Sequence, residues 1–198
     1  MIKRYPLISF YAGILVVICY ISFTILAFSQ FPLPYSPTSN WLSDLGNPNL
    51  NPQGAIFYNF GIIATAILLV LFFLGLFVWR IVNKRIQITM LYLGQGFGVL
   101  GAFCMIMSAI FPISMFEIHS FWSTALYIML STGFVFLAAA LRYHSNIPRW
   151  LLILGISTAP SVILTSLFQT IYILEWITLV LFLSFVSLVG IVTRRQFL

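Results

Sequence analysis

Six long apolar runs, separated by short polar segments, organise the hydrophobic pattern of this chain. They cover residues 7–29, 56–79, 87–111, 121–141, 150–168 and 172–193. Each has roughly the 20 apolar residues that a helix needs to cross a bilayer. Backbone groups in hydrocarbon must be hydrogen-bonded within the protein, and these runs lack the alternation of barrel strands. The pattern therefore predicts an all-α, polytopic integral membrane protein, with residues 1–198 forming a single domain of six transmembrane helices.

The charged side chains separate by membrane side once the six spans are drawn. Only 6% of the residues are charged and 62% are hydrophobic, whereas a soluble domain has about 25% charged residues. The three acids, Asp44, Glu117 and Glu175, fall at one set of span ends. All nine cations fall at the other set: Lys3, Arg4, Arg80, Lys84, Arg85, Arg142, Arg149, Arg194 and Arg195. Short loops keep Lys and Arg in the cytoplasm, so we expect a cell-membrane protein with cytoplasmic N- and C-termini.

The net charge of +6 does not indicate a nucleic-acid partner. The cations are spread along one membrane boundary, whereas nucleic-acid binding gathers them on one folded face.

The start of the chain has an alternative interpretation, because Lys3 and Arg4 precede an apolar run as in a signal peptide. The run from Leu7 to Phe28 exceeds the usual 7–15 residues of such a signal, so we interpret it as a retained span. Cleavage near Ser29 would leave five spans.

The segment 30–55 is the most polar part of the chain and is expected on the extracytoplasmic side. It contains five prolines and no Lys or Arg. Between two of these prolines the sequence predicts a short surface helix, with Thr38 or Ser39 as N-cap and Gly46 or Asn47 near the C-cap. Helical spacing places four polar residues on one face: Asn40, Ser43, Asp44 and Asn47. This face either lines a site beneath the loop or is simply solvated.

Candidate chemistry concentrates on the same side as this loop. Asp44, Glu117, His119 and Glu175 are its ionisable groups of catalytic type. A Ser–His–acid site is compatible with this inventory, with His119 as base oriented by Asp44 or Glu117, but no nucleophile elbow supports it. A zinc enzyme needs three protein ligands, and His119 and His144 fall on opposite sides. The sequence therefore predicts no metal site and no cofactor.

The third span combines a glycine face with one buried amide. Gly94, Gly98 and Gly101 lie on one side of the predicted helix, which favours close helix packing. Gln95 needs hydrogen-bond partners in the membrane, and the sequence offers Asn59, Thr65 or Ser108. We therefore expect Gln95 to mark a polar cavity that opens on the extracytoplasmic side.

Three short stretches together resemble a family of six-span prokaryotic membrane proteins, the domain-of-unknown-function family numbered 998. The stretches are Ser43-Asp44-Leu45-Gly46, Tyr58-Asn59-Phe60, and Phe111-Pro112 followed by His119. The resemblance covers residues 5–195. The family often has an Asp two residues after the Phe-Pro pair. This chain has Ser114 at that position, and Glu117 is the nearby acid that would take the place of this Asp. The family is distantly similar to the Frag1/DRAM/Sfk1-like proteins, some of which remodel lipid anchors or organise membrane lipid, which implies lipid handling here.

These expectations give a leading function and two rivals. The leading function is an extracytoplasmic polar cavity that binds or organises lipid headgroups, or a subunit role in a larger membrane complex. Its partners would be membrane lipid and other membrane subunits. The first rival is a lipid hydrolase or transferase, and the second is a small-solute carrier. The predicted ligand-binding residues are Asn40, Ser43, Asp44, Asn59, Gln95, His119 and Glu175.

Overall fold

The computed structural model describes residues 5–168 and 170–197 as six long α-helices and two short 3₁₀-helices. The long helices are α1 (Tyr5–Ser29), α2 (Ala55–Gly75), α3 (Arg85–Ile110), α4 (Phe116–Leu141), α5 (Arg149–Leu167) and α6 (Ile173–Phe197). The short ones are η2 (Leu42–Gly46) and η3 (Leu76–Trp79). All six long helices, α2 together with η3, are long and apolar enough to cross a membrane. The predicted all-α architecture with six spans is therefore confirmed.

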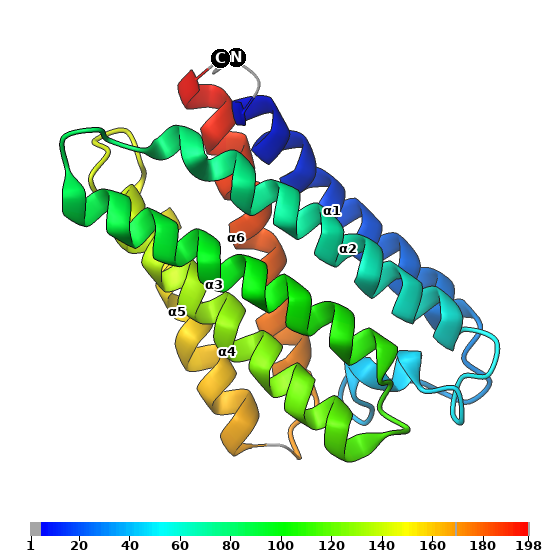
Figure 1. Cartoon of the computed structure of the whole chain (residues 1–198). Coiled ribbons are helices and arrows are strands. Elements are labelled where there is room, and N and C mark those ends of the chain that lie inside the picture. Colours follow the sequence, from blue (N-terminus) through cyan, green and yellow to red (C-terminus); the bar gives the residue numbers. More distant parts are fainter. Residues whose placement is uncertain (1–4, 169, 198) are drawn as a thin grey trace.

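The helices form a closed bundle in which each packs against its neighbours in sequence and α6 returns to α1 (Figure 1). The closest pairing joins α3 to α4. It depends on glycines, because a Cβ added to Gly94 or Gly101 would lie 2.8 Å or 2.6 Å from a leucine side chain of α4. Gly98 faces Phe73 of α2 in the same way. The predicted packing role of this glycine face is confirmed.

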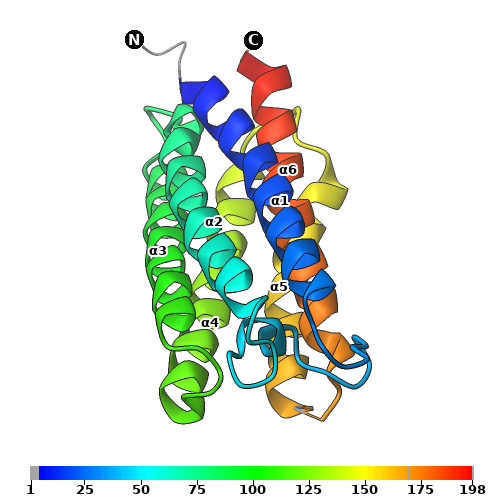
Figure 2. The ribbon, with the colours of Figure 1, turned by 90° about the vertical axis from the view of Figure 1, so that its right-hand side faces the viewer.

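The two ends of the bundle differ in charge. The start of α1 and the end of α6 lie at one end, together with the α2–α3 and α4–α5 connections (Figures 1 and 2). We call it the basic end, because it holds Arg80, Lys84, Arg85, Arg142, Arg149, Arg194 and Arg195. The opposite end, which we call the loop end, holds segment 30–54 and all three acids. Lys3 and Arg4 lie outside the described residues.

Aromatic side chains fill the middle of the bundle. Phe134 of α4 packs against Phe73 of α2 and against Phe182 and Phe185 of α6, with ring centroids 6.0, 5.1 and 4.9 Å away. Three of these rings are completely buried. This layer crosses the bundle from α2 to α6 and therefore separates the interior of the loop end from that of the basic end.

A hydrogen-bond network around Trp79 closes the basic end. The Trp79 indole N–H donates to Thr193 Oγ1 at 2.8 Å. The Trp79 carbonyl accepts from Gln87 Nε2 and from His144 Nε2, each at 2.9 Å. Gln87 Oε1 in turn accepts the Ile81 N–H at 3.0 Å. One buried residue thus joins α2, α3, α6 and the α4–α5 connection, which satisfies polar groups that burial would otherwise penalise.

Candidate functional site

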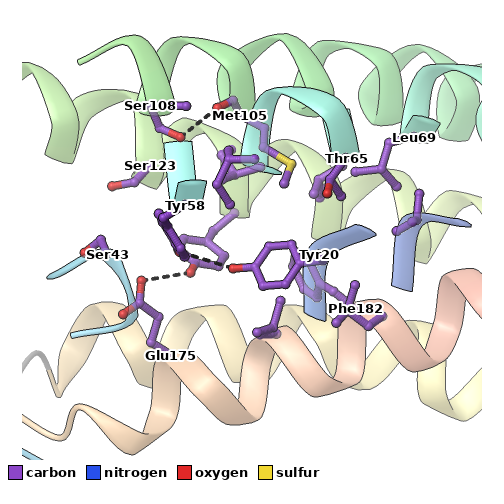
Figure 3. A pocket seen from close by; sticks show the side chains of 18 of the residues that line it. Tyr20, Ser43, Tyr58, Thr65, Leu69, Met105, Ser108, Ser123, Glu175 and Phe182 are labelled. Carbon is purple, nitrogen blue, oxygen red and sulfur yellow. Dashed lines mark hydrogen bonds between the residues drawn. The ribbon is translucent and has the colours of Figure 1, made fainter. Parts of the chain in front are cut away.

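A hollow lies inside the loop end, between helices α1, α2, α3, α4 and α6 and beneath η2 (Figure 3). It encloses about 820 Å³ of space including its open part. Its deep part is apolar and is lined by Val16, Leu69, Leu130, Phe134, Phe182 and Val186. Its mouth is polar and is lined by Ser43, Asn59, His119 and Glu175. The hollow is therefore narrow and amphipathic along its length.

The loop that covers the hollow is anchored by buried leucines and by one carboxylate. Leu42 and Leu45 of η2 are 1% and 0% exposed, so this short helix is packed into the bundle. Glu175 Oε2 accepts the Leu42 backbone N–H at 2.7 Å, and Glu175 Oε1 accepts the Tyr127 hydroxyl at 3.1 Å. Glu175 is itself buried in the first turn of α6. A polar group at this depth is tolerated because both of its oxygens receive hydrogen bonds.

The predicted short helix is present and ends as expected, with Asn47 at its C-cap, but its predicted start is wrong. Helical structure begins at Leu42, with Trp41 at the N-cap position, whereas Thr38 and Ser39 lie in the preceding turn. The physical reason is local: Asp44 Oδ2 accepts the Trp41 N–H at 2.9 Å, which starts the helix at that point. The turn before it is closed separately by Asn40 Oδ1, which accepts the Ser36 N–H at 3.1 Å.

Two asparagines tie the loop to the helices. Asn51 is completely buried, and its Nδ2 donates to the carbonyls of Ala27 and Leu45 at 3.0 and 2.9 Å. Asn59 Nδ2 donates to the Gly46 carbonyl at 3.0 Å. Gly46 has to be glycine at this contact, since an added Cβ would lie 2.5 Å from Asn59 Oδ1. At the mouth of the hollow, side-chain amides therefore hold the backbone of the loop in place.

Hydroxyl groups form the middle level of the hollow, between the mouth and the apolar depth. The Tyr20 and Tyr58 hydroxyls lie 3.2 Å apart and share one hydrogen bond, as Figure 3 shows. Because only one of these two O–H groups donates in that bond, the other is available to a ligand. Thr65 also lines the hollow, and its Oγ1 has no hydrogen-bond partner within the described part of the chain.

His119 is held by backbone carbonyls. Its Nδ1 lies 2.7 Å from the Phe111 carbonyl and 3.0 Å from the Ser108 carbonyl. Carbonyls only accept, so Nδ1 carries a proton, and in the neutral ring Nε2 is left as an acceptor. Among the described residues, the hydrogen bonds of His119 go to these carbonyls and involve neither Asp44 nor Glu117. The ring joins the end of α3 to the start of α4 and borders the hollow.

The structure brings together four of the predicted ligand-binding residues. Ser43, Asn59, His119 and Glu175 line the hollow. The other sequence-predicted residues lie elsewhere: Asn40 and Asp44 bond within the loop, Gln95 bonds to α2, and Glu117 is exposed in the first turn of α4.

The expected partners of Gln95 are wrong. Gln95 Nε2 donates to the Phe73 carbonyl at 2.6 Å and does not contact Asn59, Thr65 or Ser108 in the described hydrogen bonds. The amide therefore joins α3 to α2 at the level of the aromatic layer. Gln95 is in the half of α3 nearer the basic end, and the hollow does not extend that far into the bundle. Gln95 therefore does not line the hollow.

Sequence reasoning missed the tyrosines of the hollow. Tyr58 was named as part of a family motif, and Tyr20 and Tyr127 attracted no prediction, although all three line the hollow. A usable signal was present for Tyr20. Tyrosine favours the membrane–water interface, so Tyr20, nine residues from the end of the first predicted span, indicates a polar interior.

Within residues 5–168 and 170–197 there is no group of three His, Cys, Asp or Glu side chains that could hold a metal ion.

A second depression lies on the flank of the loop end, between α1 and α6. Its lining is made mainly of apolar and aromatic side chains: Tyr20, Ile21, Thr24, Ile25, Phe28, Trp176 and Leu179. Tyr20 and Leu179 also line the hollow, so the two spaces are neighbours. We call this depression the flank groove.

Comparison with known proteins gives one family match. The model of a family described as protein of unknown function (DUF998) matches residues 14–193. The chain belongs to the DUF998 family. No curated protein and no solved structure matches it.

The three stretches that carried the resemblance meet at the mouth of the hollow in this DUF998 protein. Ser43 lines it, Asn59 binds the Gly46 carbonyl, and His119 binds the Phe111 carbonyl. These residues come from the loop, from α2 and from the α3–α4 connection, which are far apart in sequence. The three stretches of the resemblance are therefore concentrated at one site.

Asp44 gives a prediction of pH dependence for this DUF998 protein. Partial burial raises the pKa of the Asp44 carboxyl, and hydrogen bonds from Trp41 and Asn40 offset part of the effect. The folded protein then holds this proton more tightly than the unfolded chain. Stability should therefore fall as pH rises above about 4 and level off once the folded carboxyl is ionised.

The variant Asp44→Asn should lose this part of the pH dependence, because the amide oxygen still accepts the Trp41 N–H but does not titrate. Thermal unfolding of the purified protein at a series of pH values measures the effect. Glu117→Gln, which changes an exposed acid at the same end, is the matched control and should follow the wild-type profile. Identical profiles for Asp44→Asn and wild type would contradict the prediction.

Proposed function

We propose that this protein binds a membrane lipid in the hollow, with the polar part of the lipid at the mouth and one chain in the apolar depth. The observation that carries the proposal is the change of lining along the hollow. Ser43, Asn59 and His119 supply polar contacts at the mouth, and leucine, valine and phenylalanine side chains follow below them. Concave sites that are mostly apolar with a few placed polar groups are typical of ligand-binding pockets.

The flank groove supports a lipid, and not a water-soluble solute, as the ligand. It is apolar and lies on the outer surface of two helices that are long and apolar enough to span a membrane. Tyr20 and Leu179 line both the groove and the hollow, so the two spaces are neighbours. We expect movement of these two side chains to open a lateral path by which a chain enters the hollow without crossing the loop.

The closed basic end disfavours the carrier hypothesis. The layer around Phe134 forms the floor of the hollow, and the Trp79 network lies beyond it. A carrier needs alternate access from both sides of a central site. In this arrangement the polar groups of the hollow are open to the loop end. This supports binding at one side of the membrane.

Filling the hollow tests the proposal. Ala109 of α3 is 6% exposed and lines the hollow, whereas its neighbour Ile110 is 52% exposed on the outside of the bundle. Ala109→Trp should reduce the lipid retained by the purified protein about tenfold, because the indole occupies the space of the chain. Ile110→Trp adds a similar ring to the outer surface and should retain the wild-type amount. Mass spectrometry of extracted lipid, normalised to protein, gives the measurement.

A second readout covers the case in which Ala109→Trp does not fold. A photoreactive alkyl lipid added to the wild-type protein should label residues of the hollow on α2, α4 and α6, as located by peptide mass spectrometry. Labelling restricted to the outer surfaces of the helices would contradict binding in the hollow. Equal lipid retention by folded Ala109→Trp and Ile110→Trp would contradict it as well.

A lipid hydrolase or transferase is the second candidate function. The observation in its favour is His119, whose Nδ1 is held by two carbonyls so that Nε2 can accept a proton beside the hollow. Its orientation comes from backbone and not from Asp44 or Glu117. Mass spectrometry of the same lipid-bound samples distinguishes the two functions, because catalysis would convert the retained lipid into cleaved or transferred products over time and binding alone would not.

A further inference from the structure

Thr65 is a buried hydroxyl without a partner in the described structure. It is 1% exposed and lines the hollow, and its Oγ1 has no hydrogen-bond partner among the described residues. A threonine in a helix usually donates to the carbonyl four residues earlier. Here that carbonyl belongs to Gly61 and lies 3.9 Å from Cys19 Sγ, which is placed to donate to it. A buried hydroxyl left without a partner costs about 1–3 kcal/mol, so its position calls for an explanation.

The surroundings of Thr65 favour a ligand atom over a water molecule. An internal water normally makes two to four hydrogen bonds. The neighbours of Thr65 on the same face of α2 are Ile62 and Leu69, which both line the hollow and offer no side-chain hydrogen bond. Figure 3 shows Thr65 beside Leu69 and Met105, on the side of the hollow away from Ser43 and Glu175. A water here would have too few polar partners among these side chains.

Thr65 also lies at a defined depth. Asn59 marks the mouth on α2, and Thr65 follows six residues later on the same helix. A rise of 1.5 Å per residue places it about 9 Å deeper. Figure 3 shows the Tyr20 hydroxyl, which shares a hydrogen bond with that of Tyr58, between Glu175 and Thr65. The hollow therefore presents hydrogen-bond donors at two depths below the mouth, in a wall that is otherwise apolar.

We propose that the lipid bound in the hollow carries a hydrogen-bond-accepting oxygen within its chain, about 9 Å from its polar head, and that Thr65 donates to this oxygen. This inference rests on the proposed function and names the class of ligand: a chain amphiphile with an internal hydroxyl or carbonyl oxygen. Ordinary saturated chains lack that atom and would leave the Thr65 hydroxyl without a partner.

Two neutral probes test the inference. They are 1-hexadecanol and a set of hexadecanediols that keep the first hydroxyl and carry the second at successive positions. Neutral heads keep an effect of head-group charge out of the comparison. The wild-type protein should bind one diol about three- to tenfold more tightly than 1-hexadecanol, the gain expected of one added hydrogen bond. The gain should be confined to diols whose second hydroxyl is about 9 Å from the first. Displacement of radiolabelled 1-hexadecanol measures affinity.

Two variants of Thr65 locate the effect. Thr65→Val replaces the hydroxyl by a methyl group of similar size and should bind 1-hexadecanol and every diol alike. Thr65→Ser keeps the hydroxyl and should keep the preference for the same diol. Thermal unfolding of each variant checks that the fold is retained, and Thr65→Ser serves as the informative variant if Thr65→Val is unstable.

The outcomes separate the inference from the proposed function. If the wild-type protein binds 1-hexadecanol and all diols equally, the inference is overturned while the proposed function stands. If Thr65→Val keeps the wild-type preference, the inference is also overturned. If no probe binds the wild-type protein and filling the hollow at Ala109 changes nothing, both are overturned. A position-specific preference that disappears in Thr65→Val supports the inference.

Discussion

Glu175→Ala should release the loop that covers the hollow. The change removes the acceptor of the buried Leu42 N–H and of the Tyr127 hydroxyl. Each buried donor left without a partner costs about 1–3 kcal/mol, so the loop should open locally even where the helices stay folded. Hydrogen exchange followed by mass spectrometry should show faster exchange in peptides that cover η2, and the lipid retained by the protein should decrease.

Two controls make the Glu175 prediction specific. Glu175→Gln keeps a side-chain oxygen that can accept the Leu42 N–H, so its exchange should lie between that of wild type and Glu175→Ala. Glu117→Ala removes an exposed acid from the first turn of another helix at the same end and should leave η2 unchanged. If η2 exchanges at the wild-type rate in Glu175→Ala, the carboxylate is not what holds the loop.

Trp79→Ala should cause the largest loss of global stability. Trp79 is 1% exposed, and truncating a buried large aromatic side chain costs about 3–5 kcal/mol. Its indole N–H also donates to Thr193, so the change breaks the link between η3 and α6. Thermal unfolding of the purified protein should show a large decrease in midpoint, together with faster hydrogen exchange at the basic end.

Trp150→Ala is the matched control for this prediction. Trp150 is at the same end of the bundle, in the first turn of α5, but is 53% exposed. Its truncation should change the midpoint much less. Trp79→Phe separates packing from hydrogen bonding, because it keeps most of the ring volume and loses the N–H. Equal losses in Trp79→Ala and Trp150→Ala would show that the network does not close the basic end.

These two predictions concern opposite ends of one bundle and have different functional consequences. Glu175 holds the loop that covers the hollow, so its loss should affect lipid retention more than global unfolding. Trp79 joins helices at the end that has no cavity, so its loss should affect both. We therefore expect the two ends of the bundle to respond differently to the loss of one buried side chain.

The helices and the distribution of charge could be predicted from the sequence with small errors. The largest boundary error concerns α4, expected to begin at residue 121 and found to begin at Phe116. The turn after α3 is shorter than expected, because the Met115 N–H is accepted by the Pro112 carbonyl at 2.8 Å. His119 therefore lies on a helix and not in a loop, which places its ring against the end of α3.

The hollow could be predicted only in part. Ser43, Asn59, His119 and Glu175 were recognised because polar groups near span ends are conspicuous in an apolar chain. Tyr20 and Tyr127 were missed because they lie inside the spans, and Thr65 was considered only as a partner of Gln95. Asp44 was expected to line the site, but its carboxylate bonds to the Trp41 N–H three residues away. Which polar group of a loop turns inward depends on these local bonds, and spacing alone does not reveal it.

The sequence by itself determined that this chain spans a membrane six times and that its basic and acidic groups lie at opposite ends, because span length and charge are properties of each segment alone. Only the tertiary structure decided which faces of those helices point inward. In water the buried face of a helix is distinguished by its apolar side chains. In lipid the outer face is as apolar as the core, so the hydropathy pattern cannot show that Tyr20, Tyr58, Thr65 and Tyr127 face one another around a hollow.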